Sequence, residues 1–154
     1  MLERALVSSW LSVLALWIGG SFCMSALVLP VLFLQMPSPS EAGAVAALLF
    51  PVYFRAGSVL SLIALVLTAL VSQRKGKLGH VLVALVAVMA GTQIYQALLL
   101  QPEMATLRGR TEHVARFQAL HRRSVRLNSV VLGGGLVLLA ASGVLVLRRR
   151  EPGA

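Results

Sequence analysis

Charged residues are scarce in this 154-residue chain, at 12%, against about 25% in ordinary soluble domains. Hydrophobic residues make up 58%, and only five residues are acidic against fourteen basic ones. Such a chain cannot cover a water-facing surface, which excludes a soluble enzyme or a disordered tail. The single cysteine cannot form an internal disulfide, which excludes a disulfide scaffold. We therefore expect an integral membrane protein, with residues 1–154 as one membrane domain.

The few charges leave long uncharged stretches between them, over 5–40, 56–73, 78–102 and 127–147. A helix crosses the hydrocarbon core of a bilayer, about 30 Å thick, with about 20 apolar residues. Lipid offers no hydrogen-bond partners to the backbone, so each crossing segment must be helical. The sequence predicts an all-α integral membrane protein, an antiparallel four-helix transmembrane bundle with spans at about 6–29, 54–72, 78–100 and 127–147.

The connections between these spans differ in character. Pro30 is expected to end or kink the first span, and residues 41–54 are apolar but too short to cross, which predicts a short interfacial helix between spans 1 and 2. Residues 74–77 form a tight basic turn. The long polar stretch at 101–126 is expected to be helical, with Glu112 and Arg116 spaced for an i, i+4 ion pair.

Basic residues in short loops set the orientation of a membrane protein. Each side of the predicted bundle carries seven of them, so the count ties. The tight turn and the basic tail lie directly against the membrane, which favours cytoplasmic termini in a multi-pass protein of the plasma membrane, or of the inner membrane of a bacterium. We expect the lipid bilayer and its anionic head groups as partners of the basic loops. Nucleic-acid binding is not expected, because no compact basic domain lies outside the bilayer.

Polar residues gather toward the membrane face opposite the termini. Gln93 and Gln96 lie near the end of the third span, and His121, Ser124 and Asn128 share one face of the helix that leads into the fourth. Polar groups at membrane depth either hydrogen-bond between helices or line a cavity. If these residues line a cavity, a small polar or anionic ligand binds where the topology brings the polar residues of the third and fourth spans close to their charged neighbours. The candidate ligand-binding residues are Arg55, Gln93, Gln96, Arg108, Glu112, His121, Ser124 and Asn128.

His121 carries the sharpest of these expectations. If it faces the bundle, replacing it with alanine costs roughly 1–3 kcal/mol, and its loss is coupled to that of Asn128. A histidine facing the lipid head groups would show neither effect.

The sequence has no catalytic constellation and no His/Cys cluster with metal-ligand spacing, so we expect no enzyme activity, no metal and no cofactor. His80 and His121 begin their spans on opposite membrane sides and cannot share one ligand. Copper binding by Cys23, Met24 and Met89 is chemically open, but scattered core residues explain them better. The small residues Gly133, Gly134 and Gly135 permit close helix packing, within a homo-oligomer or a larger membrane complex.

Several segments resemble the transmembrane protein 205-like family of small four-span membrane proteins, a domain of unknown function. The resemblance rests on Trp17-Ile18-Gly19-Gly20 with Pro30, on Leu49-Phe50-Pro51-Val52-Tyr53-Phe54, and on Phe117 followed by His121, Ser124 and Asn128. It implies a four-span membrane protein without a settled activity. The opening is also similar to copper-resistance D-type and haem-handling proteins, in which histidines within the spans matter; the first span here has none.

Three functions remain. The first is a membrane protein that binds or helps to move a small polar or anionic ligand near one membrane face. The second is an accessory or structural subunit of a larger membrane complex. The third is a haem- or copper-handling membrane protein.

Overall fold

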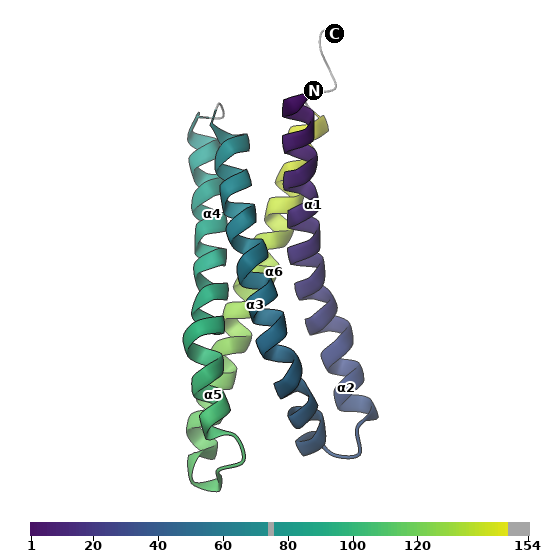
Figure 1. The fold of residues 1–154 in the computed structure, drawn as a ribbon, viewed down its shortest axis with the longest axis vertical. Coiled ribbons are helices and arrows are strands. Elements are labelled where there is room, and N and C mark those ends of the chain that lie inside the picture. The colour runs from purple at the N-terminus through teal and green to yellow at the C-terminus, as the bar shows by residue number, and fades with distance from the viewer. Residues whose placement is uncertain (74–75, 148–154) are drawn as a thin grey trace.

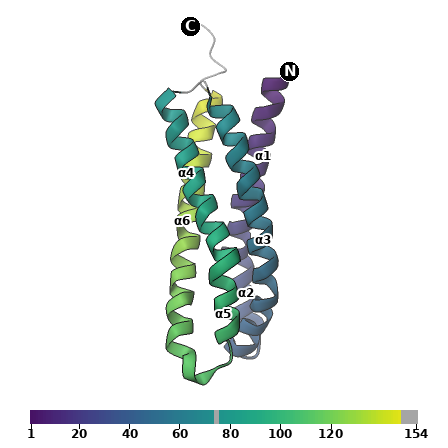
Figure 2. The ribbon, with the colours of Figure 1, turned by 60° about the vertical axis from the view of Figure 1, so that its left-hand side comes forward.

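The chain folds into four long helical rods that run antiparallel (Figure 1). The computed structural model describes residues 1–73 and 76–147, with side chains as far as 142. All four rods are long and apolar enough to cross a membrane. The protein is therefore a multi-pass membrane protein with an all-α four-helix bundle, as predicted. The start of α1 and the end of α6 lie at the same end of the bundle (Figure 2).

Two of the rods are composite. The first joins α1 (Leu2–Cys23), a π-helical turn (Met24–Val28) and α2 (Leu29–Gln35). The third joins α4 (Gly76–Tyr95), a second π-helical turn (Gln96–Leu100) and α5 (Gln101–Leu107). The second rod is the single helix α3 (Pro39–Ser72), and the fourth is α6 (Val114–Leu147), preceded by a short 3-10 turn (Thr111–His113).

The interfacial helix expected at 41–54 is helical but is not a separate element. It forms the first part of α3, which is 34 residues long and continues through Pro51. Ser38 caps this helix, because its Oγ accepts a hydrogen bond from the backbone N–H of Glu41 at 3.2 Å. At 1.5 Å per residue α3 is about 51 Å long, which exceeds the hydrocarbon thickness of about 30 Å. Residues 41–54 therefore continue the helix of the second span, where the sequence predicted a separate helix in the membrane plane.

The two π-helical turns have the same local cause. Each is followed by a proline at the second position of the next helix, Pro30 in α2 and Pro102 in α5. A proline in a helix has no N–H to donate, and its ring collides with the carbonyl four residues earlier. The wider π turn accommodates that carbonyl. Of the two expected effects of Pro30, an end or a kink, the end is not observed, because the first rod continues through it.

The core lies toward the termini end and is built on two tryptophans of α1. Trp10 and Trp17 are 1% and 2% exposed, packed with Leu14, Met89 and Leu138. The Trp10 Nε1 donates a hydrogen bond to the Thr68 Oγ1 at 2.9 Å, which ties α1 to α3 within the apolar interior. Such a bond holds the helices in register because lipid supplies no competing partner.

Glycines allow the closest helix contacts. A Cβ on Gly134 would lie 2.8 Å from the Met89 sulfur, and one on Gly135 would lie 2.8 Å from Ile18, whereas Gly133 faces open space. Two of the three glycines that were expected to suit a partner therefore pack inside the chain. Gly79 is tighter, because its Cβ would lie 2.5 Å from the backbone oxygen of Ser72.

Away from the termini the rods diverge into two pairs, α2 with the first half of α3, and α5 with the first half of α6 (Figure 1). The surfaces of the two pairs differ. The α2–α3 pair exposes apolar side chains such as Leu34 at 80% and Leu48 at 75%. The α5–α6 pair carries most of the charges of this end, with Glu103 bonded to Arg116. This bond replaces the expected Glu112–Arg116 pair, since Glu112 lies instead 3.4 Å from His113.

The contact at Gly79 predicts a difference between two glycine variants. Gly79→Ala places a methyl group against a backbone oxygen that cannot move without separating α3 from α4, so we expect a loss of about 1–3 kcal/mol in unfolding free energy. Gly91→Ala, on the same helix but facing open space, should be neutral or slightly stabilising. Equilibrium unfolding in detergent micelles measures both, and equal effects of the two variants would contradict the assigned α3–α4 contact.

Candidate functional site

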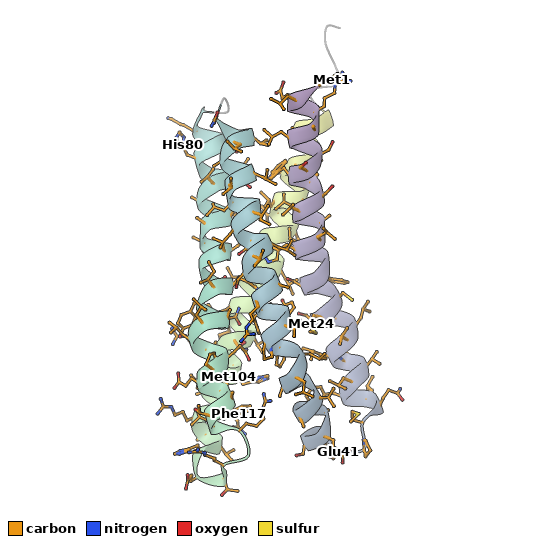
Figure 3. All side chains as sticks on the ribbon, in the orientation of Figure 1. Met1, Met24, Glu41, His80, Met104 and Phe117 are labelled. Atoms are coloured by element: carbon orange, nitrogen blue, oxygen red, sulfur yellow. The ribbon has the colours of Figure 1, made fainter. Side chains whose placement is uncertain are left out.

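A cavity of about 230 Å³ opens between the diverging helix pairs. Met24 and Met104, labelled in Figure 3, belong to its opposite walls. Tyr53 lies 20 residues before Gln73, about 30 Å along α3, which equals the hydrocarbon thickness. We therefore expect the cavity to lie near head-group level, on the side opposite the termini. Its lining combines apolar and hydrogen-bonding side chains: Met24, Ser25, Leu29, Phe50, Tyr53, Phe54, Gln101, Met104, His121, Ser124, Val125, Asn128, Ser129 and Leu132.

Asn128 joins three rods on one side of this cavity. Its Oδ1 accepts a hydrogen bond from the Tyr53 hydroxyl at 3.0 Å. Its Nδ2 donates to the Ser25 Oγ at 2.8 Å. A primary amide has two donors and two acceptor sites, so half of its capacity remains for another group.

Ser124, one helical turn before Asn128, makes a second set of bonds. Its Oγ donates to the Gln96 Oε1 at 2.7 Å and accepts a long bond of 3.4 Å from the Gln101 Nε2. Gln96 is fully buried, and its Nε2 has no hydrogen-bond partner within the described residues. The two polar networks lie side by side along α6.

The π-helical turns supply one residue to each network. Ser25 belongs to the turn at Met24–Val28 and Gln96 to the turn at Gln96–Leu100, and they bond to residues of α6 that are four positions apart. Both turns precede a proline, so the same backbone irregularity aims a polar side chain at α6 from two different rods. π turns occur frequently at functional sites.

His121 lies at the edge of the cavity. It is exposed, and its ring stacks on that of Phe117 with centroids 6.4 Å apart and an interplanar angle of 7°. In the part of the chain that is described it makes no hydrogen bond, and Asn128 bonds to Tyr53 and Ser25 instead. The geometry therefore gives no basis for the expected coupling of His121 to Asn128.

Gln93 does not line the cavity. It is fully buried against Gly57, where an added Cβ would overlap the Gln93 Nε2. Neither its Nε2 nor its Oε1 has a hydrogen-bond partner among the described residues. Gly57 therefore provides the space for a buried amide near mid-bundle.

The expected charged residues lie elsewhere. Arg55 and Arg108 line a second cavity of about 210 Å³, which also includes Gln101. Partial burial lowers the pKa of the Arg108 guanidinium, which still stays charged. Glu112 lies in the exposed turn before α6. The eight candidate residues are thus distributed over a polar cavity, a basic cavity, the bundle interior and an outer turn.

Three important polar residues were not among the sequence candidates. Ser25 is an isolated serine in an apolar span, Tyr53 stands within the Phe-Pro-x-Tyr-Phe segment, and Gln101 directly precedes Pro102. A signal existed for two of them, because Ser25 and Gln101 each lie within five residues before a proline that closely follows a predicted span. A polar residue shortly before a proline indicates an inward-facing side chain only when the proline is known to follow a π turn.

Comparison with known proteins identifies a family. Residues 12–113, about two-thirds of the chain, match the domain of unknown function DUF4149. The chain belongs to this uncharacterised domain family. The match ends before α6, so Ser124 and Asn128 lie outside the matched segment. A search of curated proteins gave no match, and a search of solved structures gave none.

The Asn128 network predicts energetic coupling across the cavity. Asn128→Ala and Ser25→Ala should each cost about 0.6–1.7 kcal/mol, the range for hydrogen bonds between membrane helices. The double variant should cost less than their sum, because both remove the same bond. The control cycle pairs Asn128→Ala with His121→Ala, which should be additive. Unfolding in bicelles decides; an additive Ser25–Asn128 cycle would show that the bond contributes nothing.

Proposed function

We propose that this protein binds a small polar molecule in the cavity between the two helix pairs, and helps to move it at one membrane face. The observation that carries the proposal is the cavity of about 230 Å³ with Ser25, Tyr53, Gln101, Ser124 and Asn128 among its lining residues. Small-molecule sites combine a mostly apolar wall with a few placed polar groups, and this lining has that composition.

The size of the cavity limits its ligand. A water molecule occupies about 30 Å³ of liquid, so 230 Å³ suits a small metabolite rather than a whole lipid. Several side chains around the cavity have donor or acceptor groups that are not used in hydrogen bonds within the described part of the protein. Gln101 is held only by a 3.4 Å bond, so its amide can turn to a ligand at little cost. Asn128 is fixed by two shorter bonds and offers a rigid contact.

The surroundings of the cavity favour transfer between two environments. One wall belongs to the α2–α3 pair with its apolar surface, and the other to the α5–α6 pair with its charges. A ligand between them would lie between an apolar surface and a charged one. No reaction step is part of this proposal, because the polar groups form hydrogen bonds rather than a nucleophile–base pair.

Within the uncharacterised family, we propose the transmembrane protein 205-like branch, on the segments around Trp17, Tyr53 and His121. We also propose cytoplasmic termini in a plasma membrane or bacterial inner membrane. Residues 74–75 of the tight turn and 148–150 of the tail lie outside the described residues. In the sequence their basic side chains directly follow or precede the spans, and positive charge is retained on the cytoplasmic side.

A pair of tryptophan variants tests ligand binding. Val125 lines the cavity and is 52% exposed, whereas Val130, on the same helix, is 44% exposed and lies outside the lining. Val125→Trp should fill the cavity and deplete the co-purifying small molecule at least several-fold, and Val130→Trp should leave it at the wild-type level. Untargeted mass spectrometry of the purified proteins measures this. If the molecules bound by the two variants are the same, the cavity is not the binding site.

The accessory-subunit function has one observation in its favour, since Gly133 faces open space on α6. Purification in mild detergent separates it from the binding function. A stoichiometric partner that Gly133→Leu releases supports the subunit, while a homogeneous small oligomer supports the binding protein. A haem- or copper-handling protein would co-purify with an optical haem band or with copper. Within the described residues no group of three His, Cys, Asp or Glu side chains could hold a metal ion.

A further inference from the structure

A groove runs between α3 and the α4–α5 rod, on the other side of Gln101 from the polar cavity. Along α3 its wall is Ala47, Pro51 and Arg55, each four residues apart, and along the facing rod it is Ala97, Gln101 and Ala105 at the same spacing, with Pro102 and Arg108. Residues four apart share one helix face. Small side chains on both faces leave the groove open, at about 210 Å³.

The two arginines lie at opposite ends of this groove. α3 and the α4–α5 rod are antiparallel (Figure 1), so Arg55 adjoins the Ala97 end and Arg108 the Ala105 end. Eight residues separate Ala97 from Ala105, an axial rise of about 12 Å. Both arginines line the groove, so one elongated molecule in it could contact Arg55 at one end and Arg108 at the other.

The positive charge in the groove is not neutralised by the protein. The lining contains no carboxylate. In the parts of the chain that are described, neither Arg55 nor Arg108 forms an ion pair, and Glu103, which lies one residue from Pro102, is bonded to Arg116. Two unpaired arginines in one cavity leave ten N–H donors for an anion.

The groove also lies at the correct depth for a lipid head group. Arg55 is 18 residues before Gln73, about 27 Å along α3, close to the far edge of a hydrocarbon core of about 30 Å. Basic pockets between membrane helices bind phosphate-bearing head groups, because the arginine fork matches two phosphate oxygens.

We propose that the Arg55–Arg108 groove is a binding site for the phosphate-bearing head group of an anionic phospholipid, separate from the polar cavity. Arg55 binds the phosphate at the edge of the hydrocarbon core, and the head group extends along the groove past Gln101 toward Arg108. The acyl chains extend along the outer, lipid-facing surface of α3 and α4. This proposal does not rest on the small-molecule function proposed above.

The test compares two charge-matched double variants of the full chain. Each protein is reconstituted in vesicles of equal parts phosphatidylglycerol and phosphatidylcholine, extracted in mild detergent, and its retained lipids are counted by native mass spectrometry. Arg55→Gln with Arg108→Gln should lower the ratio of phosphatidylglycerol to phosphatidylcholine about tenfold, the effect of losing about 1.4 kcal/mol of charge-assisted bonding. Arg122→Gln with Arg126→Gln removes the same charge from the exposed face of α6 and should change the ratio less than about twofold, as expected for weak surface electrostatics.

Further variants separate folding and free-anion effects from lipid binding. Arg55→Lys with Arg108→Lys keeps the charge but loses the fork, and should give an intermediate ratio. If the double glutamine variant does not elute as a folded species, the two single variants are compared in its place. Equal loss in the α6 control, or an unchanged ratio in the groove variant, overturns the proposal. Displacement of the retained lipid by excess inorganic phosphate also overturns it, because the site would then bind free anions.

Discussion

Two prolines within membrane helices determine where polar chemistry can occur in this protein. Pro30 and Pro102 each follow a π-helical turn, which accommodates the carbonyl that a proline ring would otherwise strike. The altered turns rotate Ser25 and Gln96 toward α6, where Asn128 and Ser124 receive them. A regular helix at either place would change the direction of every later side chain in that rod. The polar cavity therefore depends on a backbone constraint.

Few polar residues lie within the membrane helices, because an unpaired polar group surrounded by lipid costs free energy. Near the termini the hydrogen bond from Trp10 to Thr68 joins α1 to α3 inside an apolar core. Toward the other end the helices diverge and the bonds become a network around Asn128 and Ser124. The unpartnered amides of Gln93 and Gln96 lie between these two regions. Hydrogen-bonding capacity increases toward the end at which a polar molecule would enter.

The sequence determined the class of fold because hydrophobic length is a strong physical signal. The uncharged runs predicted four membrane helices, and the structure has four. The same signal failed at 41–54, where the apolar stretch before Arg55 is too short to cross a membrane and predicted a separate helix, yet α3 continues through Arg55. A long arginine side chain can leave the membrane without ending its helix. In the candidate site, Ser124, Asn128 and Gln96 are in contact with partners across the rods, but Arg55 and Arg108 lie in another cavity. Which of the two cavities a side chain lines depends on how its helix is rotated about its own axis. The spacing of residues in the sequence does not specify that rotation for a rod that contains a π turn.

Gln101 lines the polar cavity and the basic groove alike. Its amide is the wall that they share, and its one hydrogen bond, to Ser124, is long. An occupant of one compartment that binds this amide turns it away from the other, so the two compartments compete for the same amide group. By thermodynamic linkage this competition is reciprocal, because each occupant changes the binding affinity of the other by the same factor. The lipid composition around the protein would then change the affinity of the polar cavity for its ligand, although no lipid enters that cavity.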